Sequence, residues 1–340
     1  MRALRYTGLT GGDGPSVRMF SDAPDPSPGP GEALVRPLRA GVCSTDLEIA
    51  RGYMDADRDA QPITLGHEFV GVVEEFNPAT PAQQELVKRL KGKRVVGSIN
   101  AVCGECDMCR NGLSNHCRDR TVLGIAGRDG CFADRFCLPI VNLVAVPEGV
   151  DDDHAVFAEP LAAAMHAAHQ LHFEGKPYIT VLGDGRLGLL CVQVMSQLNA
   201  SVRLIGKHEK KLAMCEKWGI KHRLLRDIGR RADQDVVVDC TGSPDGLRTA
   251  MQLVRPRGTI LLKSTFAPRV DDPVDLSPLV VNEIELIGSR CGSISGAVRA
   301  LEQRRVDVAS LITSRFAFEN GTKAIDAASS AEQIKVLIDF

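Results

Sequence analysis

The first half of the chain alternates short apolar segments with turn-forming residues. Apolar segments at 33–37, 69–74, 94–97 and 143–147 are bounded by glycine, proline, asparagine or charged residues. Segments of this length between turn residues are typical of β-strands. The pattern therefore predicts that the first half of the chain is mostly β.

From residue 178 onward, short apolar runs alternate with longer amphipathic segments. We expect strands at 178–182, 201–205, 235–239 and 259–263, and helices at 186–198, 209–218 and 246–254. Nearly continuous apolar strands, separated by helices, are typical of a parallel sheet covered by helices on both faces. This half is therefore predicted to be an α/β layer with a doubly wound sheet.

Length and charge narrow the possible functions. The chain has 340 residues, enough for two domains that each bury a core. Its 41 basic and 43 acidic residues give a net charge of -2, and the basic residues are scattered, so we expect neither nucleic acid nor membrane as a partner. No apolar run has the length of a membrane helix, and the first residues lack the apolar core of a secretory signal, so a cytoplasmic location is expected.

A glycine-rich loop follows the first strand of the α/β half and precedes its first helix. The loop reads Gly183-Asp184-Gly185-Arg186-Leu187-Gly188. The first glycine permits a tight turn, the second lets the backbone approach a pyrophosphate, and the third lets the helix pack close to the strand. Free N–H groups at the start of the helix then face the phosphates. The loop is expected to bind a dinucleotide, with Asp184 adding negative charge near the pyrophosphate.

The end of the next strand bears on which dinucleotide is bound. An NAD site usually carries an acidic residue about 20 positions beyond the loop, where it bonds the ribose hydroxyls. Here the strand ends in Gly206, Lys207 and His208, with no carboxylate before Glu209. Space and positive charge suit a 2'-phosphate, so NADP is favoured over NAD. The alternative is that Lys207 and His208 are only solvated loop residues.

Four of the eleven cysteines are closely spaced. Cys103, Cys106, Cys109 and Cys117 form the pattern C-x2-C-x2-C-x7-C, whereas the other seven cysteines are dispersed. Four thiolates from one short loop complete a tetrahedral zinc shell and leave no position for a substrate. The spacing predicts a structural zinc site rather than a disulfide framework.

A second set of candidate metal ligands is spread along the chain. Cys43, the pair His67 and Glu68, and Glu159 offer one sulfur, one nitrogen and carboxylate oxygens. Catalytic zinc sites combine such ligands and leave one position open for water or substrate. Spacing alone does not join these residues into one site.

Together the motifs resemble the zinc-dependent medium-chain alcohol dehydrogenases. The family's order and spacing are found in Cys43-Ser44-Thr45-Asp46, Gly66-His67-Glu68, the four-cysteine loop, Glu159-Pro160-Leu161-Ala162 and the glycine-rich loop. The resemblance covers essentially the whole chain. It implies a GroES-like, mostly β catalytic domain at 1–150, completed by 291–340, and a Rossmann NAD(P)-binding domain at 151–290. It also implies an active site between the two domains.

The resemblance implies the ligands of a catalytic zinc. Cys43, His67 and Glu159 would hold the ion, and Glu68 would be either a fourth ligand or directly behind it. Glu159 stands where simple alcohol dehydrogenases have cysteine, which is more similar to the polyol and sugar dehydrogenase branch. With the four-cysteine loop, two zinc ions per chain are expected.

The resemblance also implies catalytic roles near Cys43. Thr45 would take the proton of the alcohol, and Asp46 would orient the zinc-bound histidine, although a turn-capping role also explains Asp46. Glu48 stands where many relatives carry the last histidine of the proton relay.

Further cofactor contacts are implied after the later strands. Thr241 and Gly242 match positions at which relatives approach the cofactor ribose. Arg290 would contact the nicotinamide or pyrophosphate, or would instead form a surface salt bridge.

The resemblance thus implies an oxidoreductase that transfers hydride between a secondary alcohol, polyol or sugar hydroxyl, or the matching carbonyl, and a nicotinamide cofactor. Zinc would act as a Lewis acid on the substrate oxygen. The alternatives are a non-catalytic nucleotide-sensing protein of the same fold and a zinc-free quinone or enoyl reductase. A homodimer or homotetramer is expected, with 280–288 as a candidate interface strand.

Overall fold

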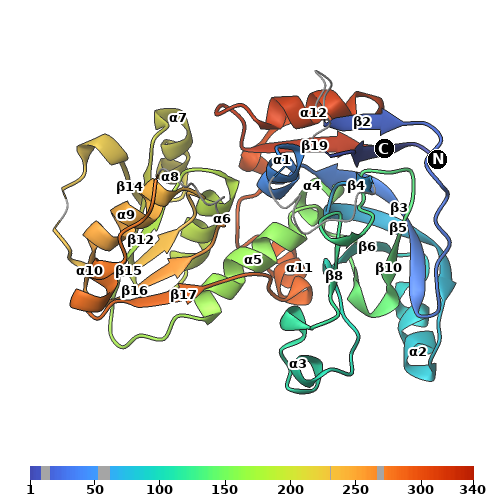
Figure 1. Ribbon diagram of the computed structural model, residues 1–340, viewed down its shortest axis with the longest axis horizontal. Coiled ribbons are helices and arrows are strands. Elements are labelled where there is room, and N and C mark those ends of the chain that lie inside the picture. Colours follow the sequence, from blue (N-terminus) through green and yellow to red (C-terminus); the bar gives the residue numbers. More distant parts are fainter. Residues whose placement is uncertain (9–15, 53–61, 230, 266–271) are drawn as a thin grey trace. The chain divides into compact units, whose positions relative to one another are not determined.

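The structure is a computed structural model that describes residues 1–8, 16–52, 62–229, 231–265 and 272–340 (Figure 1). The chain forms two compact units. Unit 1 comprises Met1–Glu159 and Ile294–Phe340, and unit 2 comprises Pro160–Ser293. The divisions predicted from the sequence lie at 150/151 and 290/291, whereas the units divide at 159/160 and 293/294.

Unit 1 is mostly β in the ranges that are described. Its strands are β1 (Ala3–Tyr6), β2 (Val17–Phe20), β3 (Glu32–Gly41), β4 (Ile63–Thr64), β5 (Glu68–Asn77), β6 (Arg94–Gly97), β7 (Asn100–Ala101), β8 (Thr121–Leu123), β9 (Gly127–Arg128), β10 (Phe136–Pro139), β11 (Leu143–Ala145), β18 (Ile312–Ala317) and β19 (Lys335–Asp339). Its helices are α1 (Ser44–Ala50), α2 (Pro81–Leu90), α3 (Asp107–Arg110), α4 (Asp152–Ala155), α11 (Ile294–Glu302) and α12 (Gly321–Ala328). Short 3₁₀ helices are η2 (Ser114–His116), η3 (Ile140–Asn142), η5 (Ala309–Leu311) and η6 (Phe318–Asn320).

The main sheet of unit 1 aligns the segments that carry the candidate zinc ligands. Its strands run in the order β11-β6-β5-β3-β19-β18, and β10 also pairs with β3. Fully buried Ala33 and Val35 alternate with more exposed neighbours along β3, as expected for a strand with one face in the core. The antiparallel ladder of β3 and β5 places Gly41 opposite Glu68, and β19 places Leu337 opposite Gly41. Residues distant in sequence therefore meet where β3 ends.

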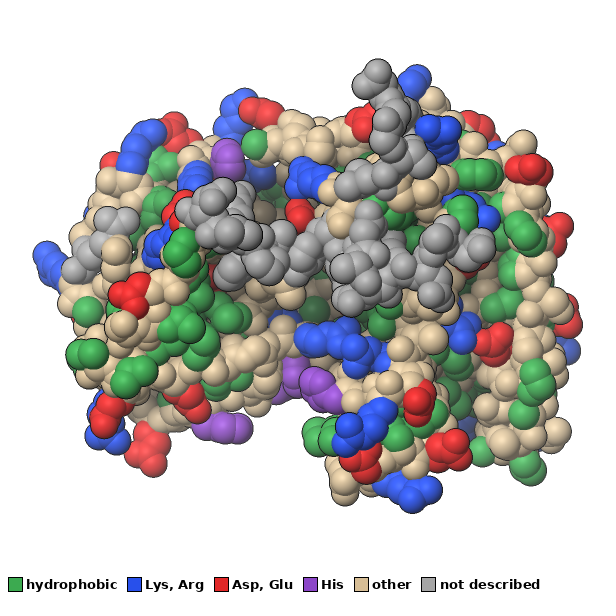
Figure 2. All heavy atoms as spheres, in the orientation of Figure 1, with side chains coloured by type: hydrophobic (Ala, Val, Ile, Leu, Met, Phe, Trp, Pro, Cys, Tyr) green, Lys and Arg blue, Asp and Glu red, His purple; other side chains and the backbone are tan. Residues whose placement is uncertain are grey.

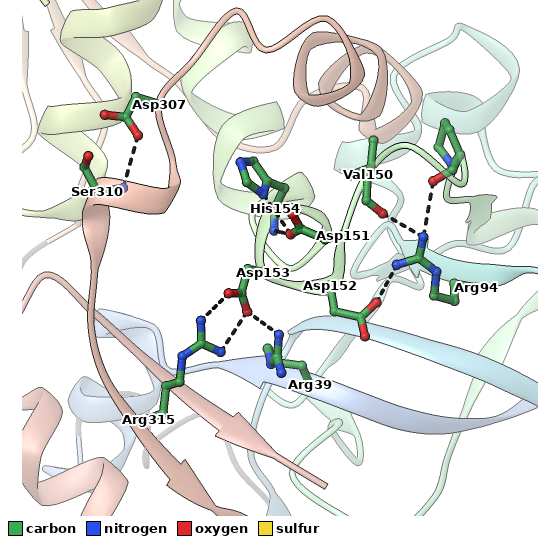
Figure 3. A network of polar contacts seen from close by, with 11 residues as sticks. Arg39, Arg94, Val150, Asp151, Asp152, Asp153, His154, Asp307, Ser310 and Arg315 are labelled. Atoms are coloured by element: carbon green, nitrogen blue, oxygen red, sulfur yellow. Dashed lines mark hydrogen bonds and ion pairs between the residues drawn. The ribbon is translucent and has the colours of Figure 1, made fainter.

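A polar network fixes α4 to the strands of unit 1 (Figure 3). The Asp153 carboxylate accepts hydrogen bonds from Arg39 of β3 and from Arg315 of β18, whose Nη1 lies 2.7 Å away. Beside it, Arg94 Nη1 donates to Asp152 Oδ1 over 2.6 Å. These ion pairs join three strands to the segment that leads to Glu159.

Unit 2 alternates strands and helices. The described strands are β12 (Tyr178–Leu182), β13 (Ser201–Gly206), β14 (Lys221–Leu224), β15 (Gln234–Asp239), β16 (Val254–Leu262) and β17 (Glu285–Gly288). The helices are α5 (Ala158–His169), which begins in unit 1, α6 (Arg186–Met195), α7 (Glu209–Leu212), α8 (Met214–Lys217), α9 (Pro244–Leu253) and α10 (Ser277–Val281), with the 3₁₀ helix η4 (Leu225–Asp227).

The sheet of unit 2 is doubly wound. Its strands run in the order β14-β13-β12-β15-β16-β17, and each neighbouring pair is parallel. Helix α6 packs on β12 and β13, and α9 packs on β15 and β16 (Figure 1). The strand order reverses between β12 and β15, which is where such sheets bind nucleotides. The predicted parallel α/β layer is confirmed, as is the mostly β first half.

The structure differs from the sequence prediction at several places in unit 2. The strand predicted at 259–263 begins at Val254 as β16, and the candidate strand at 280–288 is the end of helix α10 followed by β17. The segment 209–218 holds two short helices, α7 and α8, which meet at Ala213. Strand β14 was not predicted, because its sequence Lys-His-Arg-Leu contains no apolar run.

None of the helices in the described ranges is both long and apolar enough to cross a bilayer.

Candidate functional site

The first candidate site lies where β3 ends and β5 begins. Cys43 follows β3 and precedes α1, His67 precedes β5, and Glu68 is the first residue of β5. One ligand atom from each residue lies within 4.8 Å of the others. His67 and Glu68 are buried and Cys43 is half-buried. This group of donors, one sulfur, one nitrogen and one oxygen, fits a divalent metal such as zinc.

Glu159 is not brought into this group. Among the described residues, the group contains Cys43, His67 and Glu68 only. Glu159 is the second residue of α5, whereas the β3–β5 ladder aligns the other three residues. The structure therefore gives no geometric support for Glu159 as a ligand of the same ion.

Asp46 lies in a position that is compatible with both of its predicted roles. Its carboxylate accepts the N–H of Cys43 over 2.8 Å and the N–H of Gly66 over 3.2 Å, which caps the start of α1. Its Oδ1 also lies 3.3 Å from Nδ1 of His67, and Asp46 is fully buried. A carboxylate at Nδ1 fixes the ring and leaves Nε2 for a metal.

The protonation of His67 reflects these neighbours. Burial disfavours the charged imidazolium, but the negative charges of Asp46 and Cys43 outweigh it and raise the pKa of His67 well above its usual value. The pocket thus favours a positive charge at this position, either a proton or a metal ion.

A buried lysine forms an ion pair with Glu68. Lys335 begins β19, is fully buried and forms an ion pair with Glu68 Oε2. Burial lowers the pKa of Lys335 to about 8, against the opposing effect of Cys43 and Asp46. This residue was not predicted from the sequence. The available signal was a lysine at the head of an otherwise apolar strand, Lys-Val-Leu-Ile-Asp.

Thr45 and Glu48 lie on α1, directly after Cys43. The Thr45 hydroxyl lies 3.7 Å from Cys43 Sγ, so it borders the candidate metal position. Glu48 forms an ion pair of 2.8 Å with Arg51 on the same helix and is partly exposed.

The four-cysteine loop forms the second candidate metal site. The Sγ atoms of Cys103, Cys106, Cys109 and Cys117 all lie within 4.8 Å of one another. Cys117 Sγ lies 3.5 Å from Cys103 Sγ and 3.9 Å from Cys106 Sγ. A zinc tetrahedron with bonds of about 2.3 Å has sulfur-to-sulfur edges of about 3.8 Å. The loop therefore has the dimensions of a closed tetrathiolate site.

Backbone N–H groups of this loop donate hydrogen bonds to the cysteine sulfurs and stabilise their thiolate form. The N–H of Cys103 donates to Cys117 Sγ and the N–H of Cys106 donates to Cys103 Sγ, both over 3.4 Å. Hydrogen bonds from the backbone of Arg118 and Cys109 lower the pKa of Cys106 to about 6. A thiolate is thereby stabilised before any metal binds.

The glycine-rich loop of unit 2 has the geometry of a phosphate cradle. Gly183 follows β12 with φ of 101°, a conformation that favours glycine. A Cβ on Gly188 would lie 1.8 Å from the Gly183 carbonyl oxygen, so α6 packs directly on the loop. A Cβ on Gly185 would meet nothing within 4 Å, so the space over its backbone is open. Arg186 and Leu187, both half-buried, begin α6 beside that space.

The side chain of Asp184 is directed away from the position that was predicted for it beside the pyrophosphate. Its buried carboxylate accepts the backbone N–H groups of Lys207 and His208, over 2.8 and 2.6 Å, and lies 3.0 Å from His208 Nδ1. A Cβ on Gly206 would approach the Asp184 side chain to 2.4 Å. The charge is thus directed at the end of β13, because the side chain crosses from the loop to the neighbouring strand.

Thr241, Gly242 and Arg290 follow later strands of the same sheet. Thr241 donates to Asp239 Oδ1 from its N–H and its hydroxyl, over 2.9 and 2.7 Å, at the end of β15. Gly242 comes next, with φ of 63°. Arg290 is exposed, has no ion pair within the described part of the chain, and its carbonyl accepts a hydrogen bond from the buried Lys263, which was not predicted.

Comparison with known proteins identifies the family of both parts of the chain. The alcohol dehydrogenase GroES-like domain matches residues 29–148, and the zinc-binding dehydrogenase domain matches residues 187–305. An L-threonine 3-dehydrogenase of Streptomyces avermitilis is 30% identical over 334 residues, which are 94% of this chain and 95% of the relative. A sorbitol dehydrogenase of Halalkalibacterium halodurans is 28% identical over 93% of this chain and 94% of its own length.

Solved structures share the fold. An alcohol dehydrogenase of Thermus sp. ATN1 superposes with a TM-score of 0.85 at 24% identity, and the match covers all of both chains. Galactitol-1-phosphate dehydrogenase of Escherichia coli superposes with a TM-score of 0.83 at 23% identity, again over all of both chains. From its motifs, fold and relatives, the chain belongs to the zinc-dependent medium-chain alcohol dehydrogenase family and is an oxidoreductase of that family.

Proposed function

We propose that the protein oxidises a secondary alcohol, a polyol or a sugar hydroxyl with a nicotinamide cofactor, or reduces the matching carbonyl. The observation that carries this proposal is the group Cys43, His67 and Glu68, whose ligand atoms lie within 4.8 Å of one another. The names of two relatives, L-threonine 3-dehydrogenase and sorbitol dehydrogenase, support a substrate of this class.

Cys43 and His67 are assigned to the catalytic zinc, with Glu159 kept as the proposed oxygen ligand. When bound, zinc supplies Lewis acidity to the substrate oxygen, which lowers the pKa of an alcohol. Glu68 already has an ion pair with Lys335, so we place it behind the metal rather than on it.

The residues on α1 would move the proton and hold the histidine. Thr45, 3.7 Å from Cys43 Sγ, would accept the hydrogen bond of the substrate hydroxyl and carry its proton away. Glu48 is the proposed next relay group, and it lies on the same helix as Thr45, paired with Arg51. Asp46 would keep Nδ1 of His67 protonated, so that Nε2 stays a metal ligand.

A second zinc is proposed in the four-cysteine loop. Its closed set of sulfurs leaves no position for a substrate, so the role there is structural. The protein would then hold two zinc ions per chain.

Unit 2 would hold the cofactor through Gly183, Gly185, Arg186, Leu187 and Gly188. The open space over Gly185 supports a pyrophosphate at this loop. Further contacts are proposed from Thr241, Gly242 and Arg290, which follow neighbouring strands of the sheet.

NADP remains the favoured cofactor over NAD in this proposal. The exposed Lys207 and partly exposed His208 lie directly after β13, where they can face a 2'-phosphate. The support is the positive charge of Lys207 and the absence of a carboxylate within the segment between β13 and Glu209, although Asp184 reaches this segment from the glycine-rich loop.

A homodimer or homotetramer is also proposed. Val280 and Val281 of α10 are 80% and 77% exposed, and Leu286 lies on β17 at the edge of the sheet. Figure 2 shows hydrophobic side chains on the part of unit 2 that carries α10. Exposed apolar residues beside an open strand edge favour pairing with another chain.

A cytoplasmic location stays a prediction from composition.

The test combines metal analysis, cofactor binding and turnover. NADH and NADPH are titrated separately into zinc-replete protein, with energy transfer from Trp218, the single tryptophan, as the signal. A panel of polyols and sugars then follows by absorbance of the reduced cofactor. Two zinc ions per chain with cofactor binding and turnover support the proposal. Cofactor-dependent reduction without zinc would favour a quinone or enoyl reductase, and binding without any turnover would favour a nucleotide sensor.

A further inference from the structure

Asp184 places a carboxylate at the end of β13 from a different segment of the chain. The residue lies in the glycine-rich loop, between Gly183 and Gly185, and is 6% exposed. Its Oδ2 accepts the N–H groups of Lys207 and His208, and both of its oxygens lie within 3.1 Å of His208 Nδ1. Gly206 makes this crossing possible, because a Cβ there would lie 2.4 Å from Oδ2.

The position matters because the end of the second strand is where such sheets contact the adenosine ribose. In the usual NAD site a carboxylate of that strand accepts hydrogen bonds from the ribose hydroxyls. Here the strand itself has none before Glu209, but Asp184 supplies one from the loop.

The Asp184 carboxylate would repel a 2'-phosphate of the cofactor but could accept a hydrogen bond from a 2'-hydroxyl. A phosphate needs N–H donors and positive charge, yet the N–H groups of Lys207 and His208 already donate to Asp184. A phosphate would also be repelled by a carboxylate within a few ångströms. A hydroxyl can donate to it instead, since an ionised carboxylate has roughly four acceptor positions and Oδ1 accepts none of the backbone donors.

We propose that Asp184 is a specificity-determining residue that favours NAD(H) relative to NADP(H), and so limits the preference for NADP that Lys207 and His208 would create. The inference rests on the proposed dinucleotide site. Because the Asp184 carboxylate opposes the positive charge of Lys207, the protein is expected to bind NADH and NADPH with affinities within about tenfold of each other.

The test is the ratio of the dissociation constants of NADH and NADPH, measured by direct fluorescence titration. In Asp184→Ala the ratio is expected to shift toward NADPH by at least about tenfold, because one buried charge is removed and two N–H donors are released. Glu174→Ala is the matched control. It removes the same charge from an exposed residue that precedes β12, whereas Asp184 follows β12. It should therefore leave the ratio of the dissociation constants unchanged.

Other outcomes separate this inference from the proposed function. Binding of both cofactors to Asp184→Ala with an unchanged ratio would overturn the role of Asp184. If neither cofactor binds the unmodified protein, the proposed dinucleotide site itself is wrong. Should Asp184→Ala not fold, Asp184→Asn keeps the volume and one acceptor oxygen and is expected to shift the ratio in the same direction. A preference of the unmodified protein for NADPH above about a hundredfold would also contradict the inference, whatever the variants do.

Discussion

The two candidate metal sites of unit 1 gather their ligands in opposite ways. The four-cysteine loop takes all its sulfurs from one segment between β7 and β8, and none of these cysteines except Cys117 is fully buried. The group of Cys43, His67 and Glu68 takes its ligands from the ends of two paired strands, and two of the three residues are buried.

The difference concerns what holds each site together. In the loop the sulfurs are held by local backbone N–H groups and a largely exposed ion pair of Asp107 with Arg118, so a metal would itself order the segment. In the strand-based group the sheet, Asp46 and Lys335 already position the ligands. Loss of metal should therefore affect stability at the loop and chemistry at the strands.

The largest expected effect comes from Cys43→Ser. Losing the sulfur ligand should lower the catalytic zinc occupancy and reduce kcat/KM by at least about 1000-fold, because the Lewis acid contributes several kcal/mol. The melting temperature should change little. Metal analysis, steady-state kinetics and thermal unfolding measure the three quantities.

Cys137→Ser is the control for that variant. Cys137 is a half-buried cysteine of β10 in unit 1 and belongs to neither group. It should keep both zinc ions and full turnover. If Cys43→Ser retains normal zinc content and turnover, the strand-based group is not the catalytic site.

The next largest effect is expected for Lys335→Met. This substitution leaves the buried Glu68 carboxylate without its ion pair, and breaking a buried pair by removing one partner destabilises a protein by about 3 kcal/mol or more. Denaturant unfolding measures this loss. The double variant Lys335→Met with Glu68→Gln removes both charges and should recover most of it, whereas equal losses in both would mean that the pair contributes only by packing.

Lys335 also shows where prediction from sequence ended. The motifs around Cys43 and His67 pointed to zinc ligands, and the structure does bring Cys43, His67 and Glu68 together. The place of Lys335 depends on the pairing of β19 with β3, a contact between the end of the chain and its first fifty residues. No local pattern encodes that register. Asp184 was misplaced for the same reason, because its partners lie on a neighbouring strand.

The strands of unit 2 could be predicted from the sequence where their residues form a continuous buried apolar run. The central residues of β12, β15 and β16 are apolar and buried, and these strands were predicted, as was the helix after the glycine-rich loop. Strand β16 begins at Val254 rather than at 259, an extension that was not predicted because it contains exposed arginines. Strand β14 was not, because it is an edge strand of polar residues that is held by its ladder with β13. Edge strands depend on their neighbour rather than on their own sequence.

A smaller effect is expected for Cys103→Ser. A cross-link that closes a loop of about 15 residues contributes about 3 kcal/mol, and three remaining ligands should retain part of it. We expect a loss of about 2 kcal/mol, which is roughly 4–8 °C in melting temperature for a domain of this size. The folded fraction should keep its kcat. If Cys103→Ser and Cys43→Ser behave alike in both stability and turnover, the two sites are not divided as described.

The smallest effect concerns the ion pair that closes the four-cysteine loop. The Asp107 carboxylate binds Arg118 in two contacts of 2.6 and 2.7 Å, and the hydrogen bond from Arg118 lowers the pKa of Asp107 to about 2. A carboxyl group whose pKa is lower in the folded state stabilises the fold above its ordinary pKa. That stabilisation is lost as pH falls from about 4 through about 2. Both side chains are largely exposed, so Asp107→Asn should shift the melting temperature at pH 7 by less than about 2 °C. The difference from the unmodified protein should vanish near pH 2, and thermal unfolding of both proteins across this range measures it. A large loss at pH 7, comparable with that of Cys103→Ser, would show that the side-chain pair and not the metal orders the loop.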